Sequence, residues 1–531
     1  MKKRLLLILV LIIFISSCTS IEEPSLSPSR GITYYVDKDG VYGGTCSNSN
    51  DGLSWSSPWC TAAKAGSAVL QPGDTVNFAD GTYPIYRQGI TSSGTEGNPI
   101  TYKAYDKEVV LDCGGDNGWY ISGDDYLTLD GFKFQNCNSC ISLPSYGLTD
   151  MTDITIKNIY AGSGGCDGGI GELQGLGNLA VVTNLVIDNI TFIDTGGIGL
   201  CAGNYVNGPS VKNAVVKNSY FKGGGNIGIG RGNNITYVNN IIIEPSGHSY
   251  VVGSNYGGEL ICDGYVFASN IIIENNICFR CYDMATFCAQ NISYIHNTVI
   301  QGVWRPYPNC SAAKGSGILV SNGFGLTQES LILKDNLFAQ CNTLRLGSVG
   351  SGLESDNNYF FNVHGSYEYQ GCIPEQTNII DGEGGYYAYL NDWQSETGQD
   401  MNSNQVYGNY ADADLETLLV NPLNTINPNF APREDSWLCQ EGNEGSDGET
   451  IGALPCSDLV QECYEGTPYG SCSETQPWYC NEGNLEPNCQ ECLCANEFTC
   501  RYDGFCVESK KSRKAIAMPL FSNIKSFLDL F

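Results

Sequence analysis

A short strand motif that ends in Asn recurs along the middle of the chain and constrains its fold more than any other feature. In each copy, apolar residues alternate with polar ones. The seven copies end at Asn158, Asn189, Asn218, Asn240, Asn276, Asn297 and Asn336. The shortest steps, of 21 and 22 residues, equal one coil of a β-solenoid, and the longer steps allow an inserted loop or nearly a second coil. The repeat therefore predicts an all-β solenoid.

Asn at these positions has a structural explanation. A coil must turn sharply between strands, and Asn adopts the left-handed backbone of such turns more readily than most residues with a side chain. Asn side chains that stack from coil to coil can also exchange hydrogen bonds. We therefore interpret the seven Asn residues as structural, and the Asn-x-Ser/Thr matches among them as turns and not as glycan sites.

A second set of strands follows the first within the repeat. Residues 197–204 and 226–233 share alternating Gly and aliphatic residues. The pairs expected to stack are Ile198 on Ile227 and Leu200 on Ile229 on one face, and Gly199 on Gly228 on the other. A row of Gly on an outer face would leave a flat, open strip on which a ligand backbone or a sugar ring could lie.

The N-terminus predicts export. Basic Lys2, Lys3 and Arg4 precede an apolar run at 5–15 that is too short to span a bilayer. Small residues then precede Cys18, which resembles a bacterial lipobox whose thiol receives a lipid anchor. The alternative is an ordinary secretory signal with an accidental Cys. We therefore expect a signal peptide at 1–18, a Ser/Pro-rich tether at 19–31 and a membrane-anchored or secreted protein at the cell surface.

The 25 Cys residues indicate disulfides in an exported protein. Cys137-x-x-Cys140 and Cys278-x-x-Cys281 have metal-like spacing, but for each a disulfide is the better interpretation. Cys density rises in 456–508, where apolar residues are too sparse for a core, so this segment is predicted to be a small module held by bridges. A basic and then amphipathic tail at 509–531 either touches an anionic membrane or partner, or frays.

Several segments resemble the pectate-lyase-like superfamily of right-handed parallel β-helices. They are 61–70 as the capping helix, 71–83 as the opening coil, 97–105 and 126–132 as the next coils, 390–400 and 427–430 as the run-out, and 451–453 as the final strand. The cysteine spacing of the C-terminal module resembles growth-factor-like modules. The resemblance implies a right-handed parallel β-helix over 32–455. It also implies a polysaccharide partner, since family members include lyases, glycoside hydrolases, epimerases and binding proteins.

The formal net charge of −30 argues against a nucleic-acid partner. An acidic polysaccharide would also be repelled unless basic residues or a divalent cation intervened. In the resembled lyases an Arg or Lys is the base and calcium held by carboxylates neutralises the uronate. From their positions in this sequence, the candidates are Arg231, Arg280 and Asp283 as catalytic residues, His248, Trp304, Arg305 and Tyr307 as substrate contacts, and Asp263 and Asp283 as calcium ligands. The alternative for each is a solvated turn residue or a local ion pair.

Three functional classes fit these features. The favoured one is a polysaccharide lyase or glycoside hydrolase that acts on an extended glycan along the β-helix flank near residues 225–310. A non-catalytic glycan-binding or adhesive surface protein needs only aromatic and polar strips. A purely structural envelope spacer needs neither. In each case the protein is expected to be a monomer, and calcium is the only cofactor that the sequence suggests.

Overall fold

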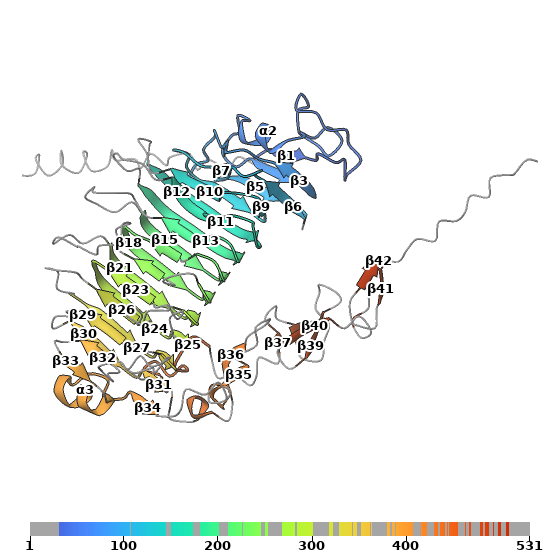
Figure 1. Cartoon of the computed structure of the whole chain (residues 1–531). Helices are drawn as coiled ribbons and strands as arrows, with labels where there is room; N and C mark the ends of the chain where they lie inside the picture. Colours follow the sequence, from blue (N-terminus) through green and yellow to red (C-terminus); the bar gives the residue numbers. More distant parts are fainter. Residues whose placement is uncertain are drawn as a thin grey trace, which may run out of the picture. The chain divides into compact units, whose positions relative to one another are not determined.

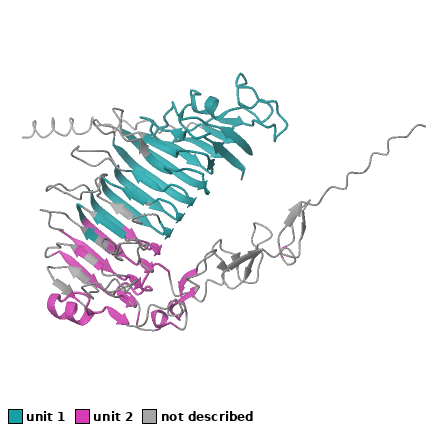
Figure 2. Ribbon diagram, in the orientation of Figure 1, with its two compact units in different colours: residues 1–272, 284–290, 320–327 teal, residues 273–283, 291–319, 328–531 magenta. Residues whose placement is uncertain are grey.

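The structure is a computed structural model. It describes residues 31–106, 108–144, 150–173, 181–200, 211–225, 227–245, 250–252, 268–281, 284–300, 318–321, 329–341, 344–347, 352–361, 363, 380–382, 385–387, 389–406, 415, 417–421, 429–433, 436–440, 443, 445–454, 462–463, 467–468, 478–481, 484–487, 492, 498–500 and 506–508. The chain divides into two compact units (Figure 2). Unit 1 comprises residues 1–272, 284–290 and 320–327, and unit 2 comprises residues 273–283, 291–319 and 328–531.

Unit 1 is built from parallel strands that pair from one coil to the next (Figure 1). The strands of sheet A are β1 (Thr33–Val36), β2 (Thr75–Phe78), β3 (Gly81–Pro84), β5 (Ile100–Ala104), β6 (Val109–Asp112), β8 (Leu127–Asp130), β9 (Lys133–Gln135), β11 (Met151–Ala161), β13 (Val182–Ile193), β15 (Val211–Lys217), β16 (Tyr220–Lys222), β18 (Gly232–Val238) and β19 (Ile241–Ile243). The strands of sheet B are β4 (Gln88–Gly89), β7 (Asn117–Tyr120), β10 (Ser139–Pro144), β12 (Ile170–Leu173), β14 (Ile198–Leu200), β17 (Ile227–Ile229), β20 (Tyr250–Val252) and β23 (Met284–Phe287). The predicted capping helix is present as α2 (Ala62–Gly66), whose N-cap Thr61 accepts a hydrogen bond from Lys64 N.

Unit 2 contains further parallel coils. Its strands include β22 (Ile277–Phe279), β25 (Thr298–Ile300), β27 (Leu331–Lys334), β28 (Leu337–Ala339), β29 (Leu344–Gly347), β30 (Leu353–Asp356), β31 (Tyr359–Phe361), β32 (Ile380–Gly382), β33 (Gly385–Tyr387), β34 (Asn404–Val406), β35 (Leu419–Asn421) and β36 (Asn429–Pro432). Residues of β21 (Ala268–Glu274), β24 (Ala289–Ile295) and β26 (Ile318–Ser321) belong to both units. The predicted right-handed parallel β-helix is confirmed, because parallel strands joined by crossovers of this kind are right-handed.

The end of unit 2 differs in part from expectation. Helix α3 (Leu390–Thr397) occupies the predicted run-out, but residues 451–453 form no strand. Instead Gly452 N donates to the carbonyl of Asp335 at 2.8 Å, so this segment lies against a coil corner. Within the cysteine-rich segment the described strands form three antiparallel hairpins. They pair β37 (Glu462–Cys463) with β38 (Thr467–Pro468), β39 (Trp478–Asn481) with β40 (Asn484–Pro487), and β41 (Phe498–Cys500) with β42 (Cys506–Glu508).

The corner Asn residues of unit 1 behave as predicted. Asn158, Asn189 and Asn218 have φ values of 56°, 54° and 51°, the left-handed conformation that the turn requires. Asn189 Nδ2 donates to Asn158 Oδ1 at 2.8 Å, and Asn158 Nδ2 donates to Asp130 Oδ1 at 2.6 Å. Each coil is therefore tied to the next by a side-chain hydrogen bond at the corner.

The other four predicted corner Asn residues occupy a different position. Asn240, Asn276, Asn297 and Asn336 are fully buried, and the left-handed residue precedes each of them. In unit 2, Asn297 Nδ2 donates to Asn336 Oδ1, and Asn336 Nδ2 donates to the Oδ1 of Asn358, both at 3.0 Å. The Asn motif therefore covers two different positions of the coil: the left-handed corner residue, and the buried residue that follows it. A shift of one residue along the coil moves a side chain from the corner surface into the core.

The disulfides confirm the expected chemistry and correct part of the pairing. Cys278 bonds to Cys281, as the sequence predicts. Cys137 and Cys140 do not bond to each other: Cys113 pairs with Cys137 and Cys140 pairs with Cys166. The partners are 24 and 26 residues apart, about one coil, so each bridge joins neighbouring coils of unit 1. Among the residues described here, no helix is both long and apolar enough to cross a bilayer.

Candidate functional site

One row of residues that alternate with the core, most of them small, runs across sheet B of unit 1. The row consists of Tyr120, Ser142, Gly171, Gly199 and Gly228, which are aligned in consecutive strand pairs. Their neighbours Trp119, Ile141, Ile170, Ile198 and Ile227 are buried in the core, because successive side chains in a strand point to opposite faces. The predicted stacking of Ile198 on Ile227, Leu200 on Ile229 and Gly199 on Gly228 is confirmed. We call these five residues the sheet B row.

The sheet B row is open over part of its length. Gly199 is exposed, Gly171 is partly exposed, and a Cβ atom built on Gly199 would meet nothing within 4 Å. By contrast, Ser142 and Gly228 are buried. Gly230, which follows β17, is buried as well. Within the row, the residues with exposed surface are therefore Tyr120, Gly171 and Gly199, and the open surface does not extend over β17 as the sequence suggested.

Arg231 lies beside the covered end of the row, in the turn that joins β17 to β18. Its main-chain carbonyl accepts a hydrogen bond from Val211 N at 3.2 Å. The residue is only 4% exposed, and this burial lowers the pKa of its guanidinium from the ordinary arginine value.

A second basic residue, which sequence reasoning missed, lies at the other end of the row. The Arg87 guanidinium carbon is 5.0 Å from the centroid of the Tyr120 ring, a cation–π arrangement. Arg87 is exposed and Tyr120 is partly exposed. The alternation of Trp119 and Tyr120 is the signal that could have found this pair, since a buried Trp119 places Tyr120 on the outer face.

Arg280 belongs to unit 2 and has a corner position. It follows β22 with a φ of 50°, and its guanidinium carbon is 4.9 Å from the centroid of the Phe279 ring. Its main-chain N donates to the carbonyl of Ile300 at 2.9 Å, which ties neighbouring coils together. The other candidates, namely Cys18, His248, Asp263, Asp283, Trp304, Arg305 and Tyr307, lie outside the described residues.

His296 has a structural environment. Its Nδ1 is 3.0 Å from the carbonyl oxygen of Thr450, and its Nε2 is 2.9 Å from Asp447 Oδ2. Both ring nitrogens therefore face acceptors supplied by the segment that follows the last coil. No group of three or more His, Cys, Asp or Glu side chains suited to a metal ion occurs in the part of the chain that the structure describes.

Comparison with known proteins finds similarity at the level of fold. No family model matches the sequence, and no curated protein matches it. Similar solved structures include a rhamnogalacturonan lyase (15% identity, TM-score 0.37, covering 62% of this chain and 87% of the lyase). A pectate lyase is 16% identical with a TM-score of 0.32, over 80% of this chain and 96% of that one. A lacto-N-biosidase from Eubacterium ramulus is 12% identical with a TM-score of 0.40, over 71% of this chain and 67% of that one. The structural neighbours are thus polysaccharide lyases and a glycoside hydrolase, and the likeness concerns the fold alone.

Proposed function

We propose that this protein acts on or binds a polysaccharide, and that an extended glycan lies along the sheet B row of unit 1. The observation that carries the proposal is the open Gly171–Gly199 surface. Neighbouring coils stack about 4.8 Å apart, a spacing comparable to the length of a sugar ring. Without Cβ atoms at these two positions, a ring can approach the strand backbone closely.

The favoured form of this activity is a polysaccharide lyase. A hydrolase needs two carboxyl groups on either side of the bond, and the sheet B row contains no carboxylate. In the lyase form, Arg231 is the base that takes the proton from the carbon next to a uronate carboxylate. The electron pair of that C–H bond forms a carbon–carbon double bond, the bond to the leaving sugar oxygen breaks, and that oxygen takes a proton from water. Burial of Arg231 supports the base role, since it favours the neutral form.

The remaining sequence candidates are proposed independently of the sheet B row. Arg280 and Asp283 are proposed as further catalytic residues, and Asp263 and Asp283 as calcium ligands that would offset the acidic surface. Contacts to the glycan are proposed for His248, Trp304, Arg305 and Tyr307. The second candidate function is non-catalytic glycan binding. It is favoured by the exposed Arg87–Tyr120 pair, which offers a cation and a ring face without requiring a base.

The test is a panel of uronate and neutral polysaccharides, assayed with and without calcium. Ultraviolet absorbance of unsaturated product, reducing ends and column retention are measured. Arg231→Ala is expected to lower the rate of product formation by about 100-fold or more, the scale of general-base catalysis, and to leave retention unchanged. Arg87→Ala is expected to weaken retention, whereas Lys212→Ala, an exposed control on β15, should change neither.

One control and two contrary outcomes complete this experiment. Arg231 is buried, so thermal unfolding of Arg231→Ala and Arg231→Lys must separate loss of activity from loss of folding. If the protein were retained on a polysaccharide column but formed no product from any substrate, the lyase proposal would be wrong and the glycan-binding function would take its place. Absence of both product and retention across the whole panel would contradict the proposal and leave the structural spacer.

We also propose that the protein is exported and held at the cell surface by a lipid on Cys18, with 456–508 as a disulfide-held module and 509–531 as its tail. The basic and apolar pattern before Cys18 supports this. Cys18→Ser is expected to release the protein from the membrane fraction or to block its processing, as judged by fractionation and immunoblotting. A variant that partitions and migrates like the wild type would show that the anchor is absent.

A further inference from the structure

A cluster of four aromatic rings lies at the N-terminal end of unit 1, apart from the sheet B row in sequence. Tyr42 stacks on Trp55 with ring centroids 4.3 Å apart and an interplanar angle of 25°. Tyr105 meets Trp55 edge-on at 5.3 Å, and Tyr35 contacts Trp55 from a third direction at 4.5 Å. These residues come from β1, from the loop that follows it and from the end of β5, so only the fold brings them together.

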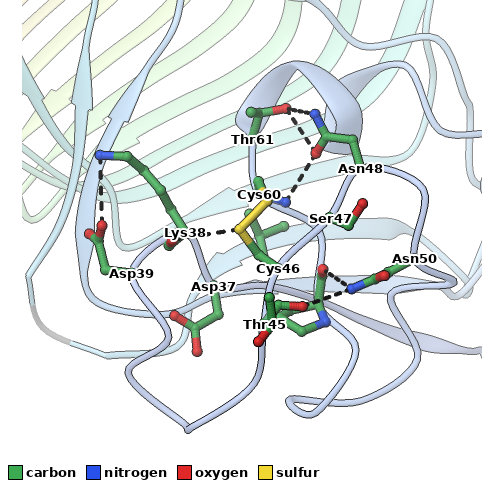
Figure 3. Close-up of a disulfide and its surroundings, with 12 residues drawn as sticks. Asp37, Lys38, Asp39, Thr45, Cys46, Ser47, Asn48, Asn50, Cys60 and Thr61 are labelled. Carbon is green, nitrogen blue, oxygen red and sulfur yellow. Dashed lines mark hydrogen bonds and ion pairs between the residues drawn. A yellow bond between two sulfur atoms is a disulfide. The ribbon is translucent and has the colours of Figure 1, made fainter.

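The loop that carries this cluster is held rigidly. A disulfide joins Cys46 to Cys60, and Figure 3 shows the hydrogen bonds around it. Asn48 accepts from Cys60 N at 3.0 Å and donates to Thr61 Oγ1 at 3.1 Å. Asn50 Nδ2 donates to two main-chain carbonyls on opposite sides of the same loop, at 3.1 and 2.9 Å. The loop conformation is therefore established before any ligand arrives, which reduces the entropy cost of binding.

Tyr42 is positioned from both ends. The buried carboxylate of Asp37 accepts hydrogen bonds from Val41 N and Tyr42 N at 2.9 and 3.0 Å. At the other end, the Tyr42 hydroxyl donates to the carboxylate of Asp106, 2.8 Å away. The ring is thus fixed at its main chain, at its face by Trp55 and at its hydroxyl.

The outer rings remain exposed although the cluster is well ordered. Tyr42 is 41% exposed and Tyr105 is 51% exposed. Trp59 shows what an aromatic residue with a packing role looks like in the same region: it is 3% exposed and stacks on Tyr34 with ring centroids 4.9 Å apart. Rigid aromatic rings held at the surface indicate a contact surface for a ligand, because a cluster whose only function was packing would bury them.

The charge around the exposed rings decides which ligand fits. Asp106 contacts Tyr42, and Asp80 and Asp39 are also carboxylates of this end of unit 1. Lys38 is paired with Asp39 at 3.9 Å and also donates to the carbonyl of Thr82. Lys103 on β5 is a basic residue of the same end, so the choice of ligand depends on Asp106, the carboxylate that contacts Tyr42. A carboxylate at this position disfavours a uronate, whereas its oxygens accept hydrogen bonds from uncharged hydroxyls.

We propose that Tyr42, Tyr105 and Asp106 form an accessory carbohydrate site, the aromatic shelf, that binds neutral pyranose sugars. The apolar C–H face of a sugar ring lies on Tyr42 and Tyr105, and Asp106 accepts hydrogen bonds from the ring's hydroxyls. The shelf is separate from the sheet B row and does not depend on Arg231. Failure of one proposal therefore leaves the other intact.

The test uses the full-length exported protein and three probes: cellohexaose and mannohexaose as neutral ligands, and hexagalacturonate as the charged comparison. Binding is measured by titration calorimetry and by quenching of tryptophan fluorescence. At least one neutral probe should bind more tightly than hexagalacturonate. Tyr42→Ala and Tyr105→Ala should each weaken that binding about tenfold, the scale of one aromatic contact. Tyr86→Ala is the matched control, since Tyr86 is 64% exposed in the same unit and lies outside the shelf.

Two further variants keep the proposal falsifiable if Tyr42→Ala disturbs the loop. Tyr42→Phe keeps the ring and should retain most of the affinity, and Asp106→Asn should weaken neutral-sugar binding while reducing the discrimination against hexagalacturonate. Product formation by the sheet B row should be unchanged in all shelf variants. Binding of no neutral probe, or an equal loss in Tyr86→Ala and Tyr105→Ala, would overturn the proposal.

Discussion

Replacement of Asp400 by alanine is expected to destabilise unit 2 by about 3–5 kcal/mol, the cost of leaving buried polar partners without their charge. The Asp400 carboxylate is almost completely buried after helix α3. It accepts hydrogen bonds from the hydroxyls of Ser355 and Ser403, from Asn358 Nδ2 and from Trp393 Nε1. Burial raises the pKa of Asp400, and the four donors oppose that rise. Loss of the carboxylate leaves the hydroxyls of Ser355 and Ser403 and the Nε1 of Trp393 without this acceptor in the core. Asn358 Nδ2 keeps its hydrogen bond to the carbonyl of Leu333 at 2.8 Å.

This prediction is checked by urea unfolding of the wild type and variants, followed by fluorescence. Asp400→Asn should be less damaging than Asp400→Ala, because an amide keeps one acceptor oxygen in place. Glu396→Ala on the exposed face of helix α3 is the control and should stay within about 0.5 kcal/mol of the wild type. If Asp400→Ala unfolded at the same urea concentration as Glu396→Ala, the carboxylate would not hold this end of unit 2 together.

Asp124→Asn is expected to stabilise unit 1 by about 2–3 kcal/mol near pH 7 and to lose that advantage near pH 4. Asp124 is 8% exposed and accepts one long hydrogen bond, from Ser122 N at 3.4 Å. Burial raises its pKa from 3.8 to about 6, and the charge of Asp125 adds to the rise. The folded state therefore binds a proton more tightly than the unfolded state does, so this group's contribution to stability falls as pH rises from about 4 to 6.

An amide cannot ionise, so Asp124→Asn removes the cost of a buried charge at neutral pH and removes little in acid. Urea unfolding at about pH 4.5 and pH 7.5 measures the difference. Asp167→Asn, the same substitution at an exposed carboxylate of unit 1, should have little effect at either pH. An equal gain at both pH values, or none at neutral pH, would show that Asp124 is not a destabilising buried charge.

The coil repeat, the sheet B strands and the structural role of the Asn residues could be predicted from the sequence because they depend on local geometry. Stacking of Ile198 on Ile227 follows from strand alternation, and the left-handed corner at Asn189 follows from the backbone preference of that residue. The buried position of Asn297 could not be predicted from the sequence in this way. A one-residue offset changes a corner residue into a core residue, and the Asn motif itself looks the same in both registers.

Only part of the candidate site could be predicted from the sequence. Arg231 was recognised from its place after the Gly-rich strand, but its burial and lowered pKa come from residues that other coils pack around it. Arg87 was missed because its partner Tyr120 is more than thirty positions away in the chain and becomes a neighbour only through sheet B. The open part of the row proved shorter than the Gly pattern suggested, since cover over a strand is supplied by other segments.

The sequence by itself determined the coil length, the alternation of core and surface in each strand, and the oxidised state of Cys278 and Cys281. These features depend on residues within a few positions of one another, where backbone sterics and side-chain periodicity act directly. The tertiary structure decided which Asn turns inward, which donors meet at Asp400, and how Tyr42, Trp55 and Tyr105 form one shelf. Burial, charge coupling and ring contacts of this kind require atoms from distant parts of the chain, so no local pattern encodes them.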